Sequence, residues 1–391
     1  MAVETRKIRV GVAGLGAVAQ SVHLPLLQRR WDLFEIAAVA DLSAGAAASV
    51  GRQFGVSAEH RYGGLTQMLD GEEARGEQLD GVLLLTSGSH GAAAAECVRR
   101  GVAVFCEKPL AYSIGEIDEL QRAEAQADRP MLLLGYMKEY DPAVRRLRER
   151  LPDPALIRYV NVEVLHPRGP SQLEYANVRP PVGDIDPSAL STVIEASNAV
   201  VANAIGADVP RPFADLYANV ILGSLIHDIA VVRNLFGGIR DVESATWWAT
   251  EDRPGSLEIS GTISDAARIH LHWHYLEDYP RYRETVTMHH TTGSLELEFT
   301  VPYLLNAPTE LRIVSRDSSG GSSGESVEVI RDVTEAFERE LVAFHAMVVD
   351  GVAPPTGSAE GRLDVLTGQA ITRALALQQG VTVTGEVAAL P

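Results

Sequence analysis

A lysine and a proline follow a buried apolar run, in a setting where the lysine could carry chemistry. The run covers residues 102–106, and Glu107-Lys108-Pro109 comes directly after it, about ninety residues past a glycine-rich turn near the N-terminus. If the run is a strand, it delivers Lys108 to the edge of a sheet. A lysine there can donate a hydrogen bond to a substrate oxygen, or exchange a proton with it.

The glycine-rich turn has the order of elements that dinucleotide binding requires. Residues 8–13 have the pattern of a short buried strand, a G-x-G-x-x-A sequence begins at Gly14, and a helical pattern runs on from it. Gly14 allows a tight turn, and Gly16 lets a pyrophosphate approach the backbone. The unpaired N–H groups at the start of the helix, where Ala17 and Val18 stand, favour phosphate. We therefore expect a nucleotide cofactor here, with Lys108 serving hydride transfer.

An acidic residue indicates which nucleotide is bound. A second predicted strand, residues 35–40, ends in Asp41, which lies 25 residues past Gly16. A carboxylate at this position accepts a hydrogen bond from the 2′-hydroxyl of the adenosine ribose and repels a 2′-phosphate. No arginine follows in Leu42-Ser43-Ala44 to neutralise such a phosphate. NAD is thus favoured over NADP. The alternative is that Asp41 only caps the following helix, a role that Ser43 could also serve.

Composition excludes several classes of partner. The chain has 391 residues, 46% of them hydrophobic, which is enough for two or three domains with cores of their own. A formal net charge of −18 disfavours nucleic acids and anionic membranes as partners. Two cysteines make neither a disulfide framework nor a zinc site. No charged and apolar leader and no apolar run near the spanning length of about 18 residues is evident, so we expect a cytoplasmic protein.

The order of predicted elements indicates an α/β fold with two domains. Strands and helices alternate through residue 136, which predicts a doubly wound parallel sheet of the Rossmann type over residues 1–136. Strands then follow one another with few helices between them, so residues 137–391 are expected to form an α+β domain with an open, largely antiparallel sheet. The strands expected in that sheet cover residues 158–165, 241–250, 257–264, 267–275, 284–290, 293–299, 311–314 and 327–330.

Several stretches resemble one family over nearly the whole chain. The chain is similar to the glucose-fructose oxidoreductase, inositol dehydrogenase and rhizopine-catabolism (Gfo/Idh/MocA) family. The resemblance implies a Rossmann domain, a C-terminal domain whose sheet often forms a subunit interface, and NAD- or NADP-dependent oxidation or reduction of a secondary alcohol on a sugar, inositol or related polyol. A homo-oligomer, dimer or tetramer, is expected. The stretches that carry the resemblance are residues 11–25, 106–111, 135–142, 226–237 and 354–380.

The resemblance also assigns roles to single residues. Lys108 would be the catalytic lysine that contacts the reacting oxygen, with Glu107 and Pro109 beside it at the cofactor and the Lys108–Pro109 peptide bond cis. His227 would be the acid/base that takes the hydroxyl proton, a role suited to an imidazole because its pKa lies near neutrality. The alternative for His227, which stands in a mostly apolar stretch, is a core histidine.

The chain departs from the family pattern at Gly223. Relatives commonly carry an aspartate four residues before the histidine, one α-helical turn away on the same face. Glycine can neither accept a hydrogen bond from the substrate hydroxyl nor raise the basicity of His227. Three possibilities stay open: Lys108 and His227 suffice, an acid or tyrosine from elsewhere fills the gap, or ordinary dehydrogenation has been lost.

A second departure is a proline-rich insertion of about forty residues within 166–217. Long ordered insertions beside a site are often lids, substrate walls or subunit contacts. We expect His166 and Arg168 to contact substrate, and Tyr175 and Arg179 are further candidates. The alternative, which the sequence supports equally, is that the insertion is a surface loop without a functional role.

Four further positions are expected around the cofactor and the substrate. Thr86 and His90 bound a loop, one residue shorter than in relatives, that should border the cofactor. Tyr136 and Lys138, just past the last strand of the nucleotide domain, match positions that line the sugar site. Tyr136 could instead be a core aromatic residue.

A row of three histidines does not indicate a metal site. His270, His272 and His274 alternate along a predicted strand and share one face. Neighbours two apart on a strand are about 7 Å apart, and no carboxylate or cysteine joins them in the sequence. A polar or aromatic face at a subunit interface is the preferred interpretation, and no bound metal is expected.

The sequence therefore predicts an NAD-dependent dehydrogenase acting on a sugar, glycoside or cyclitol. One alternative keeps NAD bound and uses it transiently, so that a sugar bond is eliminated or hydrolysed without net oxidation. The other is a cofactor-binding regulatory protein that has lost catalysis, for which Gly223 would be the sign.

Overall fold

The computed structural model describes residues 6–249, 254–317 and 324–390. These residues form two compact units, and neither unit is continuous in the sequence. The sequence-based division at residue 136 placed everything beyond it in the C-terminal domain, whereas two later segments pack with the first unit. Unit 1 is Met1–Tyr136, Ala176–Ala207 and Phe337–Val365; unit 2 is Met137–Tyr175, Asp208–Ala336 and Leu366–Pro391.

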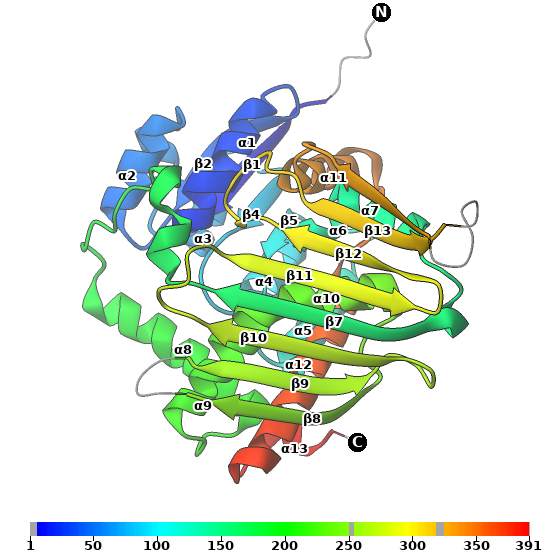
Figure 1. The fold of residues 1–391 in the computed structure, drawn as a ribbon. Helices are drawn as coiled ribbons and strands as arrows, with labels where there is room; N and C mark the ends of the chain where they lie inside the picture. Colours follow the sequence, from blue (N-terminus) through cyan, green and yellow to red (C-terminus); the bar gives the residue numbers. More distant parts are fainter. Residues whose placement is uncertain (1–5, 250–253, 318–323, 391) are drawn as a thin grey trace, which may run out of the picture. The chain divides into compact units, whose positions relative to one another are not determined.

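Unit 1 is built on a six-stranded sheet in which every pair of neighbouring strands is parallel. The strand order is β3-β2-β1-β4-β5-β6 (Figure 1). The order reverses at β1, which is the switch point where doubly wound folds bind ligands. The predicted doubly wound sheet is thus confirmed, with one short edge strand, β3, that the sequence did not predict. The strands are β1 (Ile8–Ala13), β2 (Phe34–Ala40), β3 (Arg61–Tyr62), β4 (Gly81–Leu84), β5 (Ala103–Glu107) and β6 (Leu132–Gly135).

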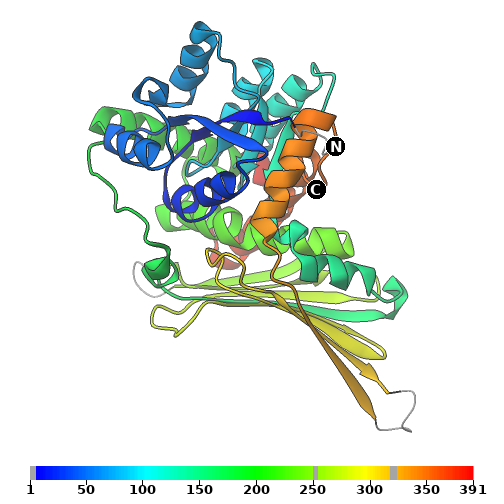
Figure 2. The same ribbon diagram turned by 90° about the horizontal axis from the view of Figure 1, so that it is seen from above.

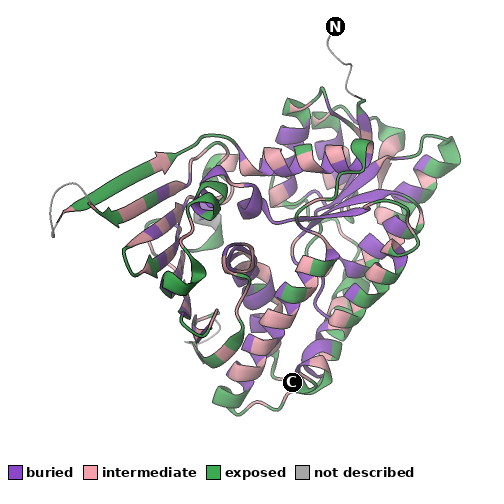
Figure 3. Ribbon diagram, turned by 90° about the vertical axis from the view of Figure 1, so that its right-hand side faces the viewer, coloured by how far each residue is buried: buried purple, intermediate pink, exposed green. Residues whose placement is uncertain are grey.

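The central strands of this sheet form the core of unit 1 (Figure 3). Every residue of β4 and β5 is buried, as expected for a parallel sheet with both faces covered. Helices connect the strands, and residues close in sequence fix where a helix begins. For example, α5 begins with a capping box between Ser113 and Glu116. The helices are η1 (Ala19–His23), α1 (Leu24–Arg29), α2 (Ala44–Gln53), η2 (Ala58–His60), α3 (Leu65–Arg75), α4 (Gly91–Arg99), α5 (Ile114–Glu124), α8 (Pro187–Ile205) and α11 (Ala336–Asp350).

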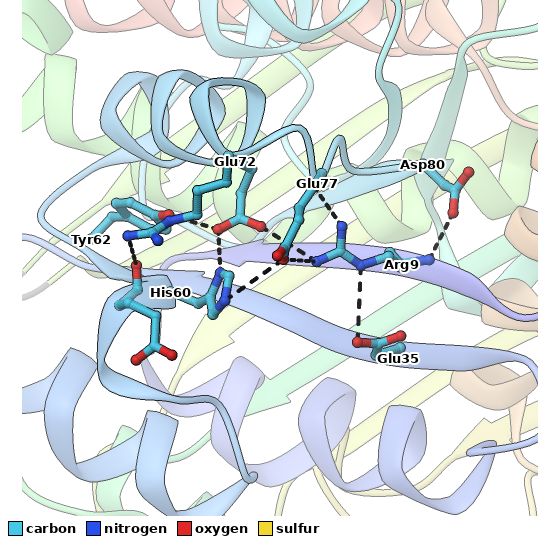
Figure 4. Close-up of polar contacts among 9 residues, drawn as sticks. Arg9, Glu35, His60, Tyr62, Glu72, Glu77 and Asp80 are labelled. Carbon is cyan, nitrogen blue, oxygen red and sulfur yellow. Dashed lines mark hydrogen bonds and ion pairs between the residues drawn. The ribbon is translucent and has the colours of Figure 1, made fainter.

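Buried Glu72 ties α3 to β1 and to the short strand β3 (Figure 4). Its carboxylate accepts hydrogen bonds from the Tyr62 hydroxyl and His60 Nδ1, each 2.6 Å away. The guanidinium of Arg9, on β1, lies 3.5 Å from the other Glu72 oxygen and 3.1 Å from Glu77. Arg9 stands at the start of β1, so we interpret this cluster as one that stabilises the fold and not as part of the site at the carboxyl ends of the strands.

Unit 2 contains an eight-stranded sheet that is antiparallel except between β10 and β7 (Figures 1 and 2). This confirms the predicted open, largely antiparallel sheet. The predicted strand 241–250 ends at Trp248, and residue 250 lies outside the described residues. The order is β14-β13-β12-β11-β7-β10-β9-β8. The strands are β7 (Ile157–His166), β8 (Asp241–Trp248), β9 (Ser256–Thr262), β10 (Arg268–Tyr275), β11 (Arg283–His290), β12 (Gly293–Phe299), β13 (Glu310–Arg316) and β14 (Glu325–Arg331).

One face of this sheet packs on helices of unit 2 (Figure 2). On β10, Ile269, Leu271 and Trp273 are buried, while the alternate residues, including all three histidines of the row, are partly exposed on the other face. The helices of unit 2 are α6 (Met137–Tyr140), α7 (Pro142–Glu149), η3 (Pro154–Leu156), η4 (Gly169–Gln172), η5 (Glu174–Ala176), α9 (Arg211–Asp215), η6 (Leu216–Leu225), α10 (Ile226–Phe236) and α13 (Gly385–Ala388). The last long helix is α12 (Ser358–Gln379).

One apolar stretch is longer than the sequence analysis recognised. The continuous helical stretch Arg211–Phe236 is long and apolar enough to cross a membrane by length and composition alone. The expectation that no run approaches this length was therefore wrong. In the structure, 67% of the apolar window is buried, as in a core helix of a globular protein. The cytoplasmic location stays a prediction.

Candidate active site

The first functional element is the turn between β1 and η1. Gly14 has φ +92°, and a side chain on it would meet the Thr86 backbone nitrogen at 2.6 Å, so only glycine fits. A side chain on Gly16 would meet nothing within 4 Å, so open space lies above the backbone where a pyrophosphate would approach. These two glycines fit the roles predicted for them. The helix that follows begins at Ala17 and becomes a π-helix over Ala19–His23, where the sequence predicted an ordinary α-helix.

Asp41 lies directly after β2 and faces this turn. One carboxylate oxygen accepts the backbone N–H of Leu15, and the other accepts that of Ser43, each at 2.8 Å. Ser43, not Asp41, is the N-cap of α2, since its hydroxyl oxygen accepts the N–H of Ala46 at 2.9 Å. The capping alternative for Asp41 is thus excluded. Its carboxylate stands where an acid binds the adenosine ribose in this fold.

The Glu-Lys-Pro triplet ends β5 at the same edge of the sheet. Glu107 is buried, and its carboxylate accepts a hydrogen bond from Nε2 of fully buried His23, 2.8 Å away. Burial acts to raise the pKa of Glu107, but the hydrogen bond and the charges of His23 and Lys108 outweigh it and lower that pKa. Lys108 is half-buried, and its backbone N–H donates to Glu107 at 3.2 Å. The Lys108–Pro109 peptide bond is cis, as the family resemblance implied.

His90 joins two loops of this edge and is itself almost inaccessible. Its Nδ1 lies 2.8 Å from the Pro109 carbonyl oxygen, and its Nε2 lies 2.8 Å from that of Thr86. Burial lowers the pKa of His90, although both carbonyl contacts act against this. Thr86 is exposed at the edge. The contact of both residues with a cofactor stays a prediction; the structure shows that His90 holds the loops after β4 and β5 together.

His227 lies in unit 2, on the second residue of α10, and is partly exposed. The preceding segment, Leu216–Leu225, is a π-helix, which hydrogen-bonds five rather than four residues apart. Gly223 is inside it. The sequence analysis assumed an α-helix here, but residues four apart also lie close to one face of a π-helix, so the relation of Gly223 to His227 stays a prediction. Segments of π-helix occur frequently at functional sites.

Lys138 occupies a buried polar cluster of unit 2 that the sequence analysis did not foresee. Its ammonium forms an ion pair with Glu284 of β11 and lies 3.6 Å from Asp228, the neighbour of His227. The Tyr282 hydroxyl donates to the second Glu284 oxygen at 2.6 Å. All four side chains are at least nine-tenths buried. We call Lys138, Asp228, Tyr282 and Glu284 the lysine cluster.

The two carboxyl groups of the lysine cluster have pKa values shifted in opposite directions. Burial and the charge of Glu284 raise the pKa of Asp228 well above its ordinary value. Burial also acts to raise the pKa of Glu284, but the Lys138 ammonium lowers it overall. The same two carboxylates outweigh burial and raise the pKa of Lys138. The surroundings therefore favour the charged forms of Lys138 and Glu284 and the neutral form of Asp228.

The remaining predicted substrate contacts differ in their surroundings. His166, at the end of β7, is partly buried and packs against the rings of Trp273, 5.4 Å away, and Tyr282, 5.8 Å away. Arg168 is exposed and forms an ion pair with Glu277. Tyr136, the last residue of the first segment of unit 1, is 2% exposed, as expected of a core aromatic residue. The structure thus brings His166 and Lys138 into one neighbourhood, through Tyr282 and Glu284, while the substrate contacts of Arg168 and Tyr136 stay predictions.

The histidine row lies on the partly exposed face of β10. Rings of His270 and His272 stack 6.0 Å apart, and those of His272 and His274 stack 6.2 Å apart. Glu258 stands opposite His272 on β9, so a carboxylate does join the row, contrary to the premise taken from the sequence. The expectation of no bound metal stays a prediction.

Three buried residues that contact the predicted site residues directly or through Glu284, and to which the sequence analysis gave no role, are His23, Glu284 and Tyr282. His23 lay within a recognised stretch, but nothing local connected it with Glu107, 84 residues later. Glu284 did leave a signal, because it shares its strand face with buried Val286 and Met288. A charge at an inward-facing strand position needs a buried partner.

Comparisons with known proteins agree with this arrangement. Residues 8–136 match the oxidoreductase family with an NAD-binding Rossmann fold, GFO_IDH_MocA. Inositol 2-dehydrogenase 3 of Saccharopolyspora erythraea is 33% identical over 144 residues, which are 36% of this chain and 40% of that relative. An inositol 2-dehydrogenase of Burkholderia ambifaria is 31% identical over 143 residues, again 40% of its length. The chain thus spans about two fifths of the length of these curated relatives.

Solved structures extend the likeness in fold to nearly the whole chain. UDP-N-acetylglucosamine 3-dehydrogenase from Acidithiobacillus ferrooxidans has a TM-score of 0.67 at 19% identity, covering 95% of this chain and 99% of that one. A 3-ketoreductase from Actinomadura kijaniata, in complex with NADP and TDP-benzene, has a TM-score of 0.68 at 18% identity, covering 95% and 98%. Residues 8–136 thus match the Gfo/Idh/MocA oxidoreductase family with its NAD-binding Rossmann fold, and the solved structures extend the likeness in fold to nearly the whole chain.

Proposed function

We propose that the protein is an NAD-dependent dehydrogenase that oxidises or reduces a secondary alcohol or ketone of a sugar, glycoside or cyclitol. The observation that carries this proposal is the position of Lys108. It follows β5, and the glycine turn follows β1, at the carboxyl ends of parallel strands of one sheet. Carboxyl ends of parallel strands meet at the same edge, so the lysine stands at the edge where the nucleotide binds.

The residues of unit 1 suit the nucleotide. Gly14 and Gly16 would hold the pyrophosphate, Asp41 the adenosine ribose, and the N–H groups of Ala17 and Val18 the phosphates. When bound, the nicotinamide supplies the hydride acceptor or donor, which no side chain can replace. The chain's own residues provide orientation and proton transfer.

We assign proton transfer to Lys108 and His227. Lys108 would donate a hydrogen bond to the reacting oxygen, and Glu107, held by His23, would keep the backbone of Lys108 in place. His227 would take or return the hydroxyl proton, since an imidazole exchanges protons near neutral pH. His166 and Lys138 are the proposed substrate contacts of unit 2; Lys138 would act with its charge already balanced by Glu284.

The substrate class follows from the relatives. The curated relatives are named inositol 2-dehydrogenases, and one fold neighbour is named a UDP-N-acetylglucosamine 3-dehydrogenase and another a 3-ketoreductase. This supports a cyclitol or sugar substrate. The names of the relatives also favour a dehydrogenase over the redox-neutral enzyme and over the regulatory protein. The glycine at position 223 does not change this preference.

The test is absorbance at 340 nm after NAD is mixed with the purified protein and a panel of inositols, sugars and nucleotide sugars. A rise with a subset of them is expected. Lys108→Ala should lower turnover by about 10²–10⁴-fold, the usual contribution of a proton-transferring group, while NAD binding persists. Lys7→Ala, at an exposed lysine, is the matched control. NAD binding without reduction by any compound would contradict the proposal and favour the two alternatives.

We also propose that copies of the chain associate through the sheet of unit 2. The face of β10 opposite its buried residues carries the stacked histidine row, and Tyr159 of β7 packs against His270 and His289 on neighbouring strands, 5.4 and 5.8 Å away. A continuous ring surface of this kind suits an isologous interface. Light scattering coupled to size-exclusion chromatography tests it: a dimer or tetramer is expected, and a monomer at micromolar concentration contradicts it.

A further inference from the structure

Part of the proline-rich insertion returns to the nucleotide-binding unit. Residues 176–207 belong to unit 1, although the sequence neighbours on both sides belong to unit 2. The segment 177–186, which leads into α8 and which we call the strap, makes two sets of contacts with unit 1 (Figure 1). The first lies at the start of α2, just past the end of β2, and the second reaches Gln20, after the glycine turn, and Gln53, at the end of α2.

The first set lies at the N-terminus of α2, directly after Asp41. One carboxylate oxygen of Asp184 accepts a hydrogen bond from the Ser43 hydroxyl, and the other accepts the backbone N–H of Gly45 at 2.7 Å. A side chain on Gly45 would meet Val182 at 2.8 Å and Asp184 at 3.0 Å, so glycine lets the strap approach the helix. The hydrogen bonds from Ser43 and from Gly45 lower the pKa of Asp184, so it is charged.

The second set lies beside the glycine turn. The backbone N–H of Arg179 donates to the side-chain oxygen of Gln20 at 3.1 Å, and its guanidinium donates to Gln53 at 3.0 Å. Gln20 in turn donates to the carbonyl oxygen of Leu15 at 2.8 Å. Since the N–H of Leu15 donates to Asp41, the strap is connected through hydrogen bonds to the acid predicted to bind the ribose.

These contacts bear on the 2′ position of the adenosine ribose. The acid after β2 marks the ribose, and a 2′-phosphate would extend past it toward the start of α2. A helix N-terminus with free N–H groups attracts such a phosphate. Here the N–H of Gly45 and the hydroxyl of Ser43 already serve a carboxylate of the chain, and a phosphate would meet two negative charges, Asp41 and Asp184.

We propose that Asp184 is a specificity-determining residue that, together with Asp41, selects NAD against NADP from a strap lying along the adenosine end of the cofactor. The proposal rests on the nucleotide binding of the proposed function. It gives the insertion a role in cofactor choice that the sequence did not indicate.

The test is the dissociation constants of NAD and NADP, measured by isothermal titration calorimetry on the whole chain. Wild type should bind NAD more tightly. Asp184→Asn should tighten NADP about tenfold, the order expected from removing one charge several ångströms from a phosphate at a partly solvated site, and should leave NAD within about twofold. The gain should shrink as salt is added, because exposed charges are screened. Asp186→Asn, two residues along the strap at the N-cap of α8, is the matched control and should change neither constant.

Two results would overturn the proposal. An unchanged ratio of the two constants in both Asp184→Asn and Asp184→Ala would show that Asp184 takes no part in the choice. Equal weakening of both nucleotides would show that the strap only supports the fold. If the wild type bound neither nucleotide, the proposed function itself would fail, so the two failures are distinguishable.

Discussion

The lysine cluster of unit 2 predicts an unusual pattern of stabilities. Asp228 and Glu284 both face the ammonium of buried Lys138, and we expect only Glu284 to carry the negative charge, because the pKa of Asp228 is raised and that of Glu284 is lowered. Asp228→Asn should therefore cost little, since an amide resembles a protonated carboxyl. Glu284→Gln should cost about 1.5–3 kcal/mol, the range for a hydrogen bond to a charged group, because Asp228 then ionises and takes over.

The double variant Asp228→Asn/Glu284→Gln should cost more than the sum of the two single changes. It leaves Lys138, whose side chain is 7% exposed, without a counter-ion. Removing the partner of a buried charge costs about 3–5 kcal/mol. The coupling free energy between the two positions should accordingly be about 1–2 kcal/mol in the destabilising direction, within the range known for residues in one network.

The assay is urea denaturation at pH 7 followed by tryptophan fluorescence in a Trp31→Phe background. Trp31 is 71% exposed, and the three other tryptophans all belong to unit 2, so the signal reports that unit. Glu325→Gln, at an exposed glutamate of β14, is the matched control and should be neutral. Additive costs, or an Asp228→Asn variant as unstable as Glu284→Gln, would refute the proton assignment.

The same assignment fixes the sign of a pH dependence. Folded protein keeps a proton on Asp228 that the unfolded chain releases near its ordinary pKa of 3.8. The folded state then binds more protons, so wild-type stability should fall, relative to Asp228→Asn, as pH rises from about 4 toward the raised pKa. Glu284 has the opposite sign: its lowered pKa contributes stability above the ordinary value of 4.5, which is lost on acidification.

Two further predictions concern unit 1. His23→Ala should destabilise the protein by about 2–4 kcal/mol and should also lower turnover, because the Glu107 carboxylate loses its buried hydrogen-bond donor. Thermal unfolding measures the first effect and steady-state kinetics the second. Wild-type values in both assays would contradict the role of His23. Gly14→Ala should abolish measurable NAD binding, because the methyl group collides with the loop after β4 and the backbone at Gly14 is left-handed. Titration calorimetry measures NAD binding. Gly16→Ala should fold normally, because a side chain there would meet no atom within 4 Å.

Sequence alone predicted the carboxyl edge of unit 1 because each of its residues directly follows a buried strand. Gly14, Asp41 and Lys108 follow β1, β2 and β5, and a parallel sheet places those strand ends together whatever the details of packing. Local patterns and one topological rule were sufficient there.

Contacts between distant residues were beyond the same reasoning. Lys138 meets Glu284 at a separation of 146 residues, and Ser43 meets Asp184 at 141. Such pairs depend on sheet register and on the path of a long insertion, which no local pattern encodes. The segment that contains Gly223 is a different case: hydrophobic periodicity does not distinguish an α-helix from a π-helix over ten residues, so the sequence did not predict the π-helix there.

Two buried histidines of unit 1, His23 and His90, position the backbone around Lys108 through its neighbours, and neither has a part in the proposed proton transfer. His23 comes from the helix after the glycine turn and binds Glu107, while His90 lies against the carbonyl groups of Thr86 and Pro109. Between them they connect the loops after β1, β4 and β5. The contacts of His23 with Glu107 and of His90 with Pro109 are buried and therefore costly to separate. The fold of unit 1 itself therefore positions the backbone of Lys108. Binding of the nucleotide and the substrate does not have to supply the free energy for ordering this backbone.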